Sequence, residues 1–344
     1  MWPIMERYLQ TAHTIAQIRW LQLLERRMRS SPKANLGASA QDTLMIEYDT
    51  EGFVEVTGGK IWYGIKGKNY KGIPIITLHG GPGAPHNYLE SLETLSDDRP
   101  IIFYDQLGCG KSERPLDNTL WTVSRFVEEL NSLRDCLNIR DVHLMGQSWG
   151  SILACEYYLF RPYGIRSLIL SGPAMSIPRF ERDVRNLLLY LPKEYQNAIA
   201  NAEATGDYDS VDYEKAVTAF YRRHICRLDK WPACLDDTIS GMGKSVYNYM
   251  YGPSEFTVTG TLKEYDCTSK LSQIEVPVLL TCGQYDEVTP ETAAHYAREM
   301  QNSKLVVIYG ASHEHHLEKP EEYIQTVRGF VESIEKHAQT ARFE

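Results

Sequence analysis

Short apolar runs, each bounded by turn residues, recur through most of the chain. Six of them are almost continuously apolar, as expected of strands that are buried on both faces of a parallel sheet. They are IPIITLHG (73–80), PIIFYDQ (100–106), VHLMGQS (142–148), SLILSGP (167–173), VPVLLTCG (276–283) and KLVVIYG (304–310). An earlier segment, EGFVEVTGGKIWYGIKG (51–67), alternates instead and predicts a hairpin that turns at Gly58-Gly59.

Helical periodicity separates these runs. In SRFVEELNSLRDCLNI (124–139) five apolar residues share one face, and Ser124 is the expected N-cap. A second helix is expected from Trp149 to about Phe160, because Pro162 follows it. Strands that alternate with helices predict a doubly wound α/β fold.

The alternation stops between residues 176 and 268. This stretch contains helix-like segments, many aromatic residues and no convincing strand before EFTVTG (255–260). We expect a largely helical cap at 176–268, inserted between two parts of an α/β core at 41–175 and 269–344. A cap at this place would cover the carboxyl edge of the sheet, where the active sites of open α/β sheets lie.

Composition excludes some classes of protein. The 344 residues are 43% apolar and carry a formal charge of −9, so there is no basic surplus for binding nucleic acid. The seven cysteines are scattered, with no C-x-x-C pair, which favours a reducing, cytoplasmic location and predicts no cysteine metal site. No stretch is apolar enough to predict a transmembrane segment.

Residues 1–40 contain a helical pattern that lies outside the α/β core. The segment TAHTIAQIRWLQLLERRMRSS (11–31) has apolar residues at helical spacing and three arginines close together. It predicts an N-terminal helical extension that packs on the body or on a partner. A membrane-surface or organelle-targeting helix is the alternative, and Glu6 and Glu25 count against a transit peptide.

The segment GQSWG (146–150) suggests a nucleophile. An apolar strand leads into it and a helical pattern leaves it, which is the context that a G-x-S-x-G elbow requires. The glycines permit a sharp turn that exposes the hydroxyl of Ser148, and the helix N-terminus that follows favours negative charge. A tight turn without chemistry is the alternative interpretation.

A serine nucleophile needs a base and a carboxylate that orients it, and in this fold they follow in the order Ser, Asp/Glu, His. GQYDEVTP follows the strand at 276–283, and GASHEHH follows the strand at 304–310. Asp286 and His313 therefore belong to the same sheet edge as Ser148. Glu287 competes with Asp286 for its role, as His315 and His316 do with His313. The histidines could also form a metal cluster, but no carboxylate–histidine spacing supports one.

Acyl transfer also needs an oxyanion hole. One donor is expected to be the backbone N–H of Trp149, the residue after the nucleophile, and the other should come from the loop LHGGPGAPHNY (78–88). Glycines in that loop let the backbone approach a substrate oxygen closely.

Four motifs together resemble the proline iminopeptidases, which are α/β-hydrolase aminopeptidases. They are HGGPG (79–83), DQLGCGKS (105–112), GQSWG (146–150) and YDEVTP (285–290). The resemblance is strongest to the branch with the tricorn-interacting aminopeptidase and the L-amino-acid amidases. It runs from about residue 42 to 335 and includes GPSEFTVTGTLKEYD (252–266) in the cap. The extra histidines of GASHEHHLEKPEEY depart from the mostly apolar family pattern. They are expected at the rim of the pocket, where they would affect the substrate preference.

The resemblance implies roles for seven residues. Ser148, Asp286 and His313 would form the triad, and Gly81 and Trp149 would supply the oxyanion N–H groups. Glu255 and Glu287 would bind the free amino group of the substrate, because two carboxylates at one end of a closed pocket suit a chain terminus.

The expected function is therefore a serine aminopeptidase. It would release an N-terminal residue, proline or a small apolar one, from short peptides or amino-acid amides with a free N-terminus, without a cofactor. An L-amino-acid amidase or esterase on the same scaffold is the first alternative, and a non-catalytic receptor with a hydrolase fold is the second. The sequence does not predict the oligomeric state.

Overall fold

The computed structural model describes residues 46–340, so the helix expected within residues 1–40 lies outside the described residues. In the described part of the chain, eight strands form one sheet in the order β1-β2-β4-β3-β5-β6-β7-β8. Only β2 runs against its neighbours, and the pairings from β4 to β8 are parallel. The strands are β1 (Thr50–Val56), β2 (Gly59–Lys66), β3 (Ile75–Leu78), β4 (Ile101–Tyr104), β5 (Val142–Gln147), β6 (Ile165–Ser171), β7 (Val278–Gly283) and β8 (Ser303–Ile308).

This topology confirms the prediction of a doubly wound α/β fold. Each of the six apolar runs overlaps a strand of the sheet, and the alternating segment forms the β1–β2 hairpin. The helices are α2 (Val123–Cys136), α3 (Trp149–Phe160), α4 (Ile177–Leu188), α5 (Lys193–Thr205), α6 (Val211–His224), α7 (Ala233–Ser240), α8 (Lys244–Met250), α9 (Pro290–Glu299), α10 (His315–Glu318) and α11 (Pro320–Thr340). Three 3-10 segments are η1 (His86–Asp97), η2 (Asn118–Leu120) and η3 (Thr268–Gln273).

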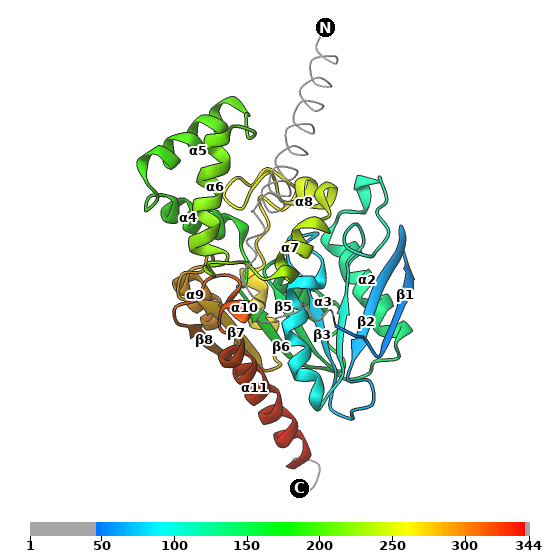
Figure 1. The fold of residues 1–344 in the computed structure, drawn as a ribbon. Helices are drawn as coiled ribbons and strands as arrows, with labels where there is room; N and C mark the ends of the chain where they lie inside the picture. The colour runs from blue at the N-terminus through cyan, green and yellow to red at the C-terminus, as the bar shows by residue number, and fades with distance from the viewer. Residues whose placement is uncertain (1–45, 341–344) are drawn as a thin grey trace, which may run out of the picture.

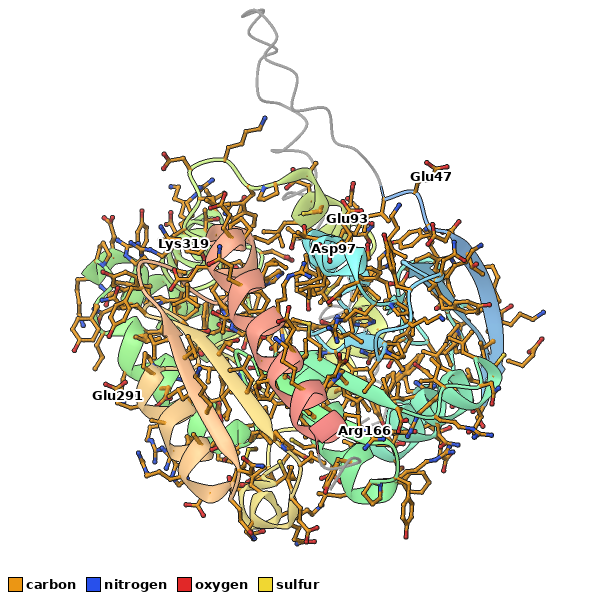
Figure 2. The ribbon with its side chains drawn as sticks, turned by 90° about the horizontal axis from the view of Figure 1, so that it is seen from below. Glu47, Glu93, Asp97, Arg166, Glu291 and Lys319 are labelled. Carbon is orange, nitrogen blue, oxygen red and sulfur yellow. The ribbon has the colours of Figure 1, made fainter. Side chains whose placement is uncertain are left out.

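The two faces of the sheet bury alternate residues of the same strands. On β7, Leu280 belongs to the same buried apolar cluster as the side chains of α2 and α3, whereas Leu279 belongs to the cluster that contains those of η1 and α11. Burial on both faces explains why the strands are continuously apolar in sequence. Seen from below, α11 crosses the sheet beside η1, which carries the labelled Asp97 (Figure 2). Arg328 of α11 donates to the Oδ1 of that aspartate at 2.7 Å.

Helices α4 to α8 lie between β6 and β7 in the chain and stack over one end of the sheet (Figure 1). The two ends of this excursion meet. Ser176 and Asp266 form an isolated antiparallel bridge, and the Ser176 hydroxyl donates to Asp266 Oδ2 at 2.7 Å. Beside them, Cys267 N–H donates to the carbonyl of Met175 at 3.0 Å. We therefore use "cap" for residues 176–266.

Two local predictions were wrong. Helix α2 begins at Val123, and its N-cap is Thr122, whose hydroxyl accepts from the Arg125 N–H, so Ser124 lies inside the helix. Serine and threonine can both cap a helix. Here the backbone is still extended at Thr122 and helical from Val123 onward, so Thr122 is the residue in the capping position. Segment 255–260 forms turns instead of a strand, because the Thr259 and Gly260 N–H groups both donate back to the carbonyl of Tyr251. The second predicted helix, 149–160, has the bounds expected.

Candidate active site

Ser148 stands at the junction of β5 and α3. Its backbone has φ 53° and ψ −120°, a conformation that costs free energy for an L-residue and persists only where its surroundings hold it. The Ser148 N–H donates to the carbonyl of Ser171, and the Ser148 carbonyl accepts from the Ser151 N–H, both at 2.9 Å. The residue lines the main cavity of the described chain. This arrangement is the strained elbow that the sequence predicts.

The two glycines of GQSWG are required by close backbone contacts. A Cβ atom on Gly146 would lie 2.2 Å from the carbonyl oxygen of Gly150. A Cβ atom on Gly150 would lie 1.9 Å from the carbonyl oxygen of Leu78, at the end of β3. Side chains at either position would therefore push α3 away from β3 and β5, and the elbow would open.

Asp286 follows β7 and His313 follows β8, and the fold brings their side chains together. His313 Nδ1 donates to Asp286 Oδ1 at 2.7 Å. The carboxylate is itself held, because Oδ1 accepts from the Val288 N–H at 2.9 Å and Oδ2 from the Gly283 N–H at 3.2 Å. His313 lines the same cavity as Ser148. The arrangement can orient an imidazole toward a reacting hydroxyl.

The two rival histidines occupy other places. His315 Nδ1 donates to the carbonyl of Ser312, and its Nε2 is hydrogen-bonded to the hydroxyl of Thr281 at 2.9 Å. His316 Nε2 donates to the carbonyl of Tyr88 at 3.0 Å. Burial lowers the pKa of His315 to about 4 and that of His316 to about 3, so both rings are neutral at pH 7. Their hydrogen bonds serve the packing of α10.

The predicted oxyanion donors lie on opposite sides of the elbow. Trp149 is the first residue of α3, so its N–H is one of the helix donors that have no acceptor within the helix. Gly81 has φ 105°, and a Cβ atom there would lie 2.7 Å from the nitrogens of Gly83 and Ala84. Gly81, Ser148 and Trp149 line one small pocket together. Their placement allows two N–H groups to meet an oxygen on an acyl group attached to Ser148.

Glu287 is a buried carboxyl at the cavity wall. Its Oε1 lies 3.7 Å from His313 Nε2, and its Oε2 has no hydrogen-bond partner in the described chain. Burial, followed by the neighbouring charge of Glu255, raises the pKa of Glu287 well above its usual range. Glu287 is therefore not the acid that orients His313, since Asp286 holds that position.

Glu255 reaches the same cavity from the cap. It follows α8 in the chain and is partly buried. The Tyr247 hydroxyl donates to its Oε1 at 2.7 Å, and the Tyr251 hydroxyl donates to its backbone carbonyl at 3.2 Å. Burial raises the pKa of Glu255 from its usual value. Two carboxyls whose charges are destabilised by burial would gain free energy from a cation that enters between them.

The charges around His313 favour its protonated form. Burial lowers the pKa of this imidazole, but the charges of Asp286 and Glu287 outweigh the burial and raise the pKa to about 10. A cation bound at Glu287 would oppose this effect and release the neutral imidazole. The occupancy of the carboxyl pair and the protonation state of His313 are therefore linked.

Cap and core enclose the cavity together. Its volume is about 170 Å³, roughly ten times the space that one water molecule needs. The cap contributes an aromatic wall of Tyr208, Tyr213, Tyr221, Trp231 and Tyr247. The core contributes Gly81, Ser148, Glu287 and His313. The arrangement suits a small molecule that carries an apolar body and a charged end.

Comparison with known proteins agrees with this geometry. The model of the α/β hydrolase fold family matches residues 73–320. Proline iminopeptidase of Heyndrickxia coagulans is 45% identical over 286 residues, which are 83% of this chain and 99% of that protein. The chain belongs to the proline iminopeptidase family of α/β hydrolases. Proline iminopeptidase of Saccharolobus solfataricus is 37% identical over 83% of this chain and 93% of its own length.

A solved structure extends the likeness to three dimensions. The crystal structure of proline iminopeptidase from Mycobacterium smegmatis superposes with a TM-score of 0.79 at 34% identity, covering 84% of this chain and all of that one. The resemblance that the sequence motifs suggested is thereby confirmed, as is the α/β-hydrolase fold.

Sequence reasoning missed two residues of this proline iminopeptidase family site. Gly172 follows β6 with φ 53°, and a Cβ atom there would lie 2.6 Å from His313 Cε1. Gln106 accepts from the Trp149 indole N–H at 2.9 Å and so fixes the residue after the nucleophile. The position of Gly172 directly after a strand of the sheet was a usable signal. The role of Gln106 depends on a contact between distant segments.

A possible metal group lies beneath the site. Within residues 46–336, His79, Asp105 and Cys109 are the one set of metal-ligating side chains close enough to share an ion. Protein groups already occupy these atoms, because His79 Nε2 accepts from the Gln106 N–H at 2.9 Å and Asp105 Oδ1 accepts from the His86 N–H at 2.9 Å. These three side chains therefore hold the surrounding loops in place through hydrogen bonds.

Among the described helices, none is long and apolar enough to cross a membrane.

Proposed function

We propose that this chain is a serine aminopeptidase that releases an N-terminal proline, or another small apolar residue, from short peptides. One observation carries the proposal. The buried carboxyls of Glu255 and Glu287 line the same cavity as Ser148 and His313. A protonated terminal amine held by that pair would bring the first carbonyl of a peptide to the serine and would exclude internal peptide bonds.

The proposed chemistry is acyl transfer. Ser148 Oγ attacks the carbonyl carbon while His313 Nε2 accepts its proton, and Asp286 stabilises the imidazolium. The N–H groups of Gly81 and Trp149 bind the oxyanion. His313 then protonates the leaving amine, and water releases the first residue from the acyl-enzyme in a second proton transfer to His313. No cofactor takes part in this proposal.

The substrate class follows from the shape and charge of the cavity. The aromatic wall suits the ring of proline or a small apolar side chain, and the relatives named proline iminopeptidase support that choice. The cap restricts the substrate to short peptides or amino-acid amides with a free N-terminus. All seven cysteines are free, which supports the further proposal of a cytoplasmic location.

One comparison of substrates tests the proposal. The wild-type protein should hydrolyse prolyl and alanyl arylamides and leave their N-acetylated forms intact, because acetylation removes the charge that Glu255 and Glu287 bind. Equal rates on free and acetylated prolyl arylamides would make the protein a general amidase or esterase. If the protein hydrolyses neither the free nor the acetylated arylamides, and a fluorophosphonate does not label it, the protein is a non-catalytic receptor.

A further inference from the structure

A third carboxyl lines the cavity and has no role in the chemistry above. Glu314 lies between β8 and α10 with 6% of its surface exposed. Its backbone N–H donates to the carbonyl of Ile225 at 2.8 Å, so its position is fixed. Its Oε2 has no hydrogen-bond partner in the part of the chain that the structure describes. Such an atom loses its hydration without compensation unless a ligand supplies a donor.

No charged side chain of residues 46–336 forms an ion pair with Glu314, although the imidazole of His313 lies near enough for its charge to be felt. Among residues 46–336, the one ion-pair contact of its carboxyl is with His316, whose Nε2 lies 3.6 Å from Oε2. That imidazole is neutral at pH 7, and its Nε2 proton is donated to the carbonyl of Tyr88. Burial raises the pKa of Glu314 to about 8, and the nearby charge of His313 only partly opposes this rise.

The cavity wall on this side differs from the wall around Glu255. It is formed by η1, by the segment that precedes α7 and by α7 itself, and its lining side chains are Tyr88, Ile225, Trp231, Leu235 and Thr238. An apolar and aromatic wall that ends in one carboxyl matches a lysine or arginine side chain, because such residues pack their methylene groups on apolar surface and pair their charged ends.

We propose that Glu314 forms a second cation subsite, which binds a basic side chain of the substrate in addition to the terminal amine. This inference rests on the proposed aminopeptidase function. The basic side chain can belong to the first residue of the peptide or to the second residue, and the two sources share the same chemistry at Glu314.

Two pairs of substrates distinguish the sources. The first pair is Pro-Lys-amide and Pro-norleucine-amide, and the second is the arylamides of lysine and norleucine. Norleucine has the methylene chain of lysine without its charge. We expect kcat/KM to favour the lysine member of at least one pair by about tenfold or more, the range of a charge-assisted hydrogen bond.

The variant Glu314→Gln should reduce that preference to near unity. Glu321→Gln is the matched control, because it makes the same chemical change at an exposed acid at the start of α11, away from the cavity. The control should keep the preference. The ratio within each pair is independent of how much enzyme is folded.

Two results would overturn the subsite. One is equal kcat/KM for lysine and norleucine in both pairs, which needs only the wild type. The other is a lysine preference that survives in Glu314→Gln. Either would leave the aminopeptidase function intact if proline is released from Pro-norleucine-amide. No release from any of the four substrates would overturn the proposed function and the subsite with it.

Discussion

The Nε2 atom of His313 lies 3.7 Å from Oε1 of Glu287. In the proposed mechanism this nitrogen accepts a proton from Ser148, and the neighbouring carboxyls favour the charged form of the imidazole. A substrate ammonium that binds Glu287 would remove this preference. In the proposed function, recognition of the chain terminus and activation of the base would therefore be coupled through these two side chains.

A pH profile with a neutral ester measures this coupling. The ester brings no cation, so kcat/KM reports His313 in the free enzyme. Because the pKa of His313 is raised to about 10, its neutral fraction grows as the pH rises, and kcat/KM should increase from pH 7 toward pH 10. Glu287→Gln should move the midpoint toward neutral pH. Rates with Ser148→Ala give the background of uncatalysed hydrolysis, and a midpoint unchanged by Glu287→Gln would contradict the coupling.

Ser148→Ala should lower the activity on prolyl arylamide by about three orders of magnitude or more, because the covalent route is lost. The variant should keep the circular dichroism spectrum of the wild type and should not react with a fluorophosphonate. Retention of more than a few per cent of the activity would exclude Ser148 as the nucleophile.

His313→Ala and His315→Ala should behave differently. Loss of His313 should abolish turnover per folded molecule, since the ring lines the cavity, and it should also lower the unfolding temperature because Asp286 loses its buried partner. Loss of His315 should lower the unfolding temperature, because its hydrogen bonds to Thr281 and Ser312 are buried. Turnover per folded molecule and thermal unfolding separate the two effects. Equal loss of turnover in both variants would mean that the base is misassigned.

Gly172→Ala tests the space beside the base. The new Cβ atom would lie 2.6 Å from His313 Cε1, so the ring must shift, and kcat should fall by about tenfold or more. Gly310→Ala is the control. It also has a positive φ, 78°, but its Cβ atom would meet only Lys319 Cε at 3.7 Å. If both variants lose stability and both keep full kcat, Gly172 has no effect on the site.

Glu255→Gln should raise KM for prolyl arylamide about ten- to a hundredfold, because a charge-assisted hydrogen bond contributes about 1.5–3 kcal/mol. The same variant should lose little on a neutral ester, which has no amine to bind. Steady-state kinetics on both substrates give the comparison. A similar loss on both would indicate that the substitution damages the cavity.

Local pattern was enough for most of the fold. The strands were predictable because burial on both faces forces continuous apolar runs, and the second helix because a proline follows it. The N-cap of α2 was not predictable. Thr122 and Ser124 both carry a hydroxyl that can cap a helix, and only the backbone conformation decides which of them does so. The turns at 255–260 were missed because their N–H groups bond to Tyr251, outside the segment.

The candidate site divides in the same way. Ser148, Asp286 and His313 could be named because each follows a strand at one edge of the sheet, so order and placement were enough. The residues alone left three histidines and two acids as candidates. The family resemblance implied His313 and Asp286, and the fold places Nδ1 of the one 2.7 Å from Oδ1 of the other. Glu314 escaped notice because nothing in GASHEHH indicates which side chains meet a cavity.

The bridge between Ser176 and Asp266 makes the cap a unit that evolution can replace. The two ends of the cap lie side by side at this bridge, so a different excursion could be spliced there without re-routing any strand. Ser148, His313 and Asp286 lie outside this stretch and would be inherited unchanged. New preferences for substrates could then arise by exchanging one continuous stretch of the gene, with Glu287 and Glu314 remaining as the fixed acids to which any replacement must be fitted.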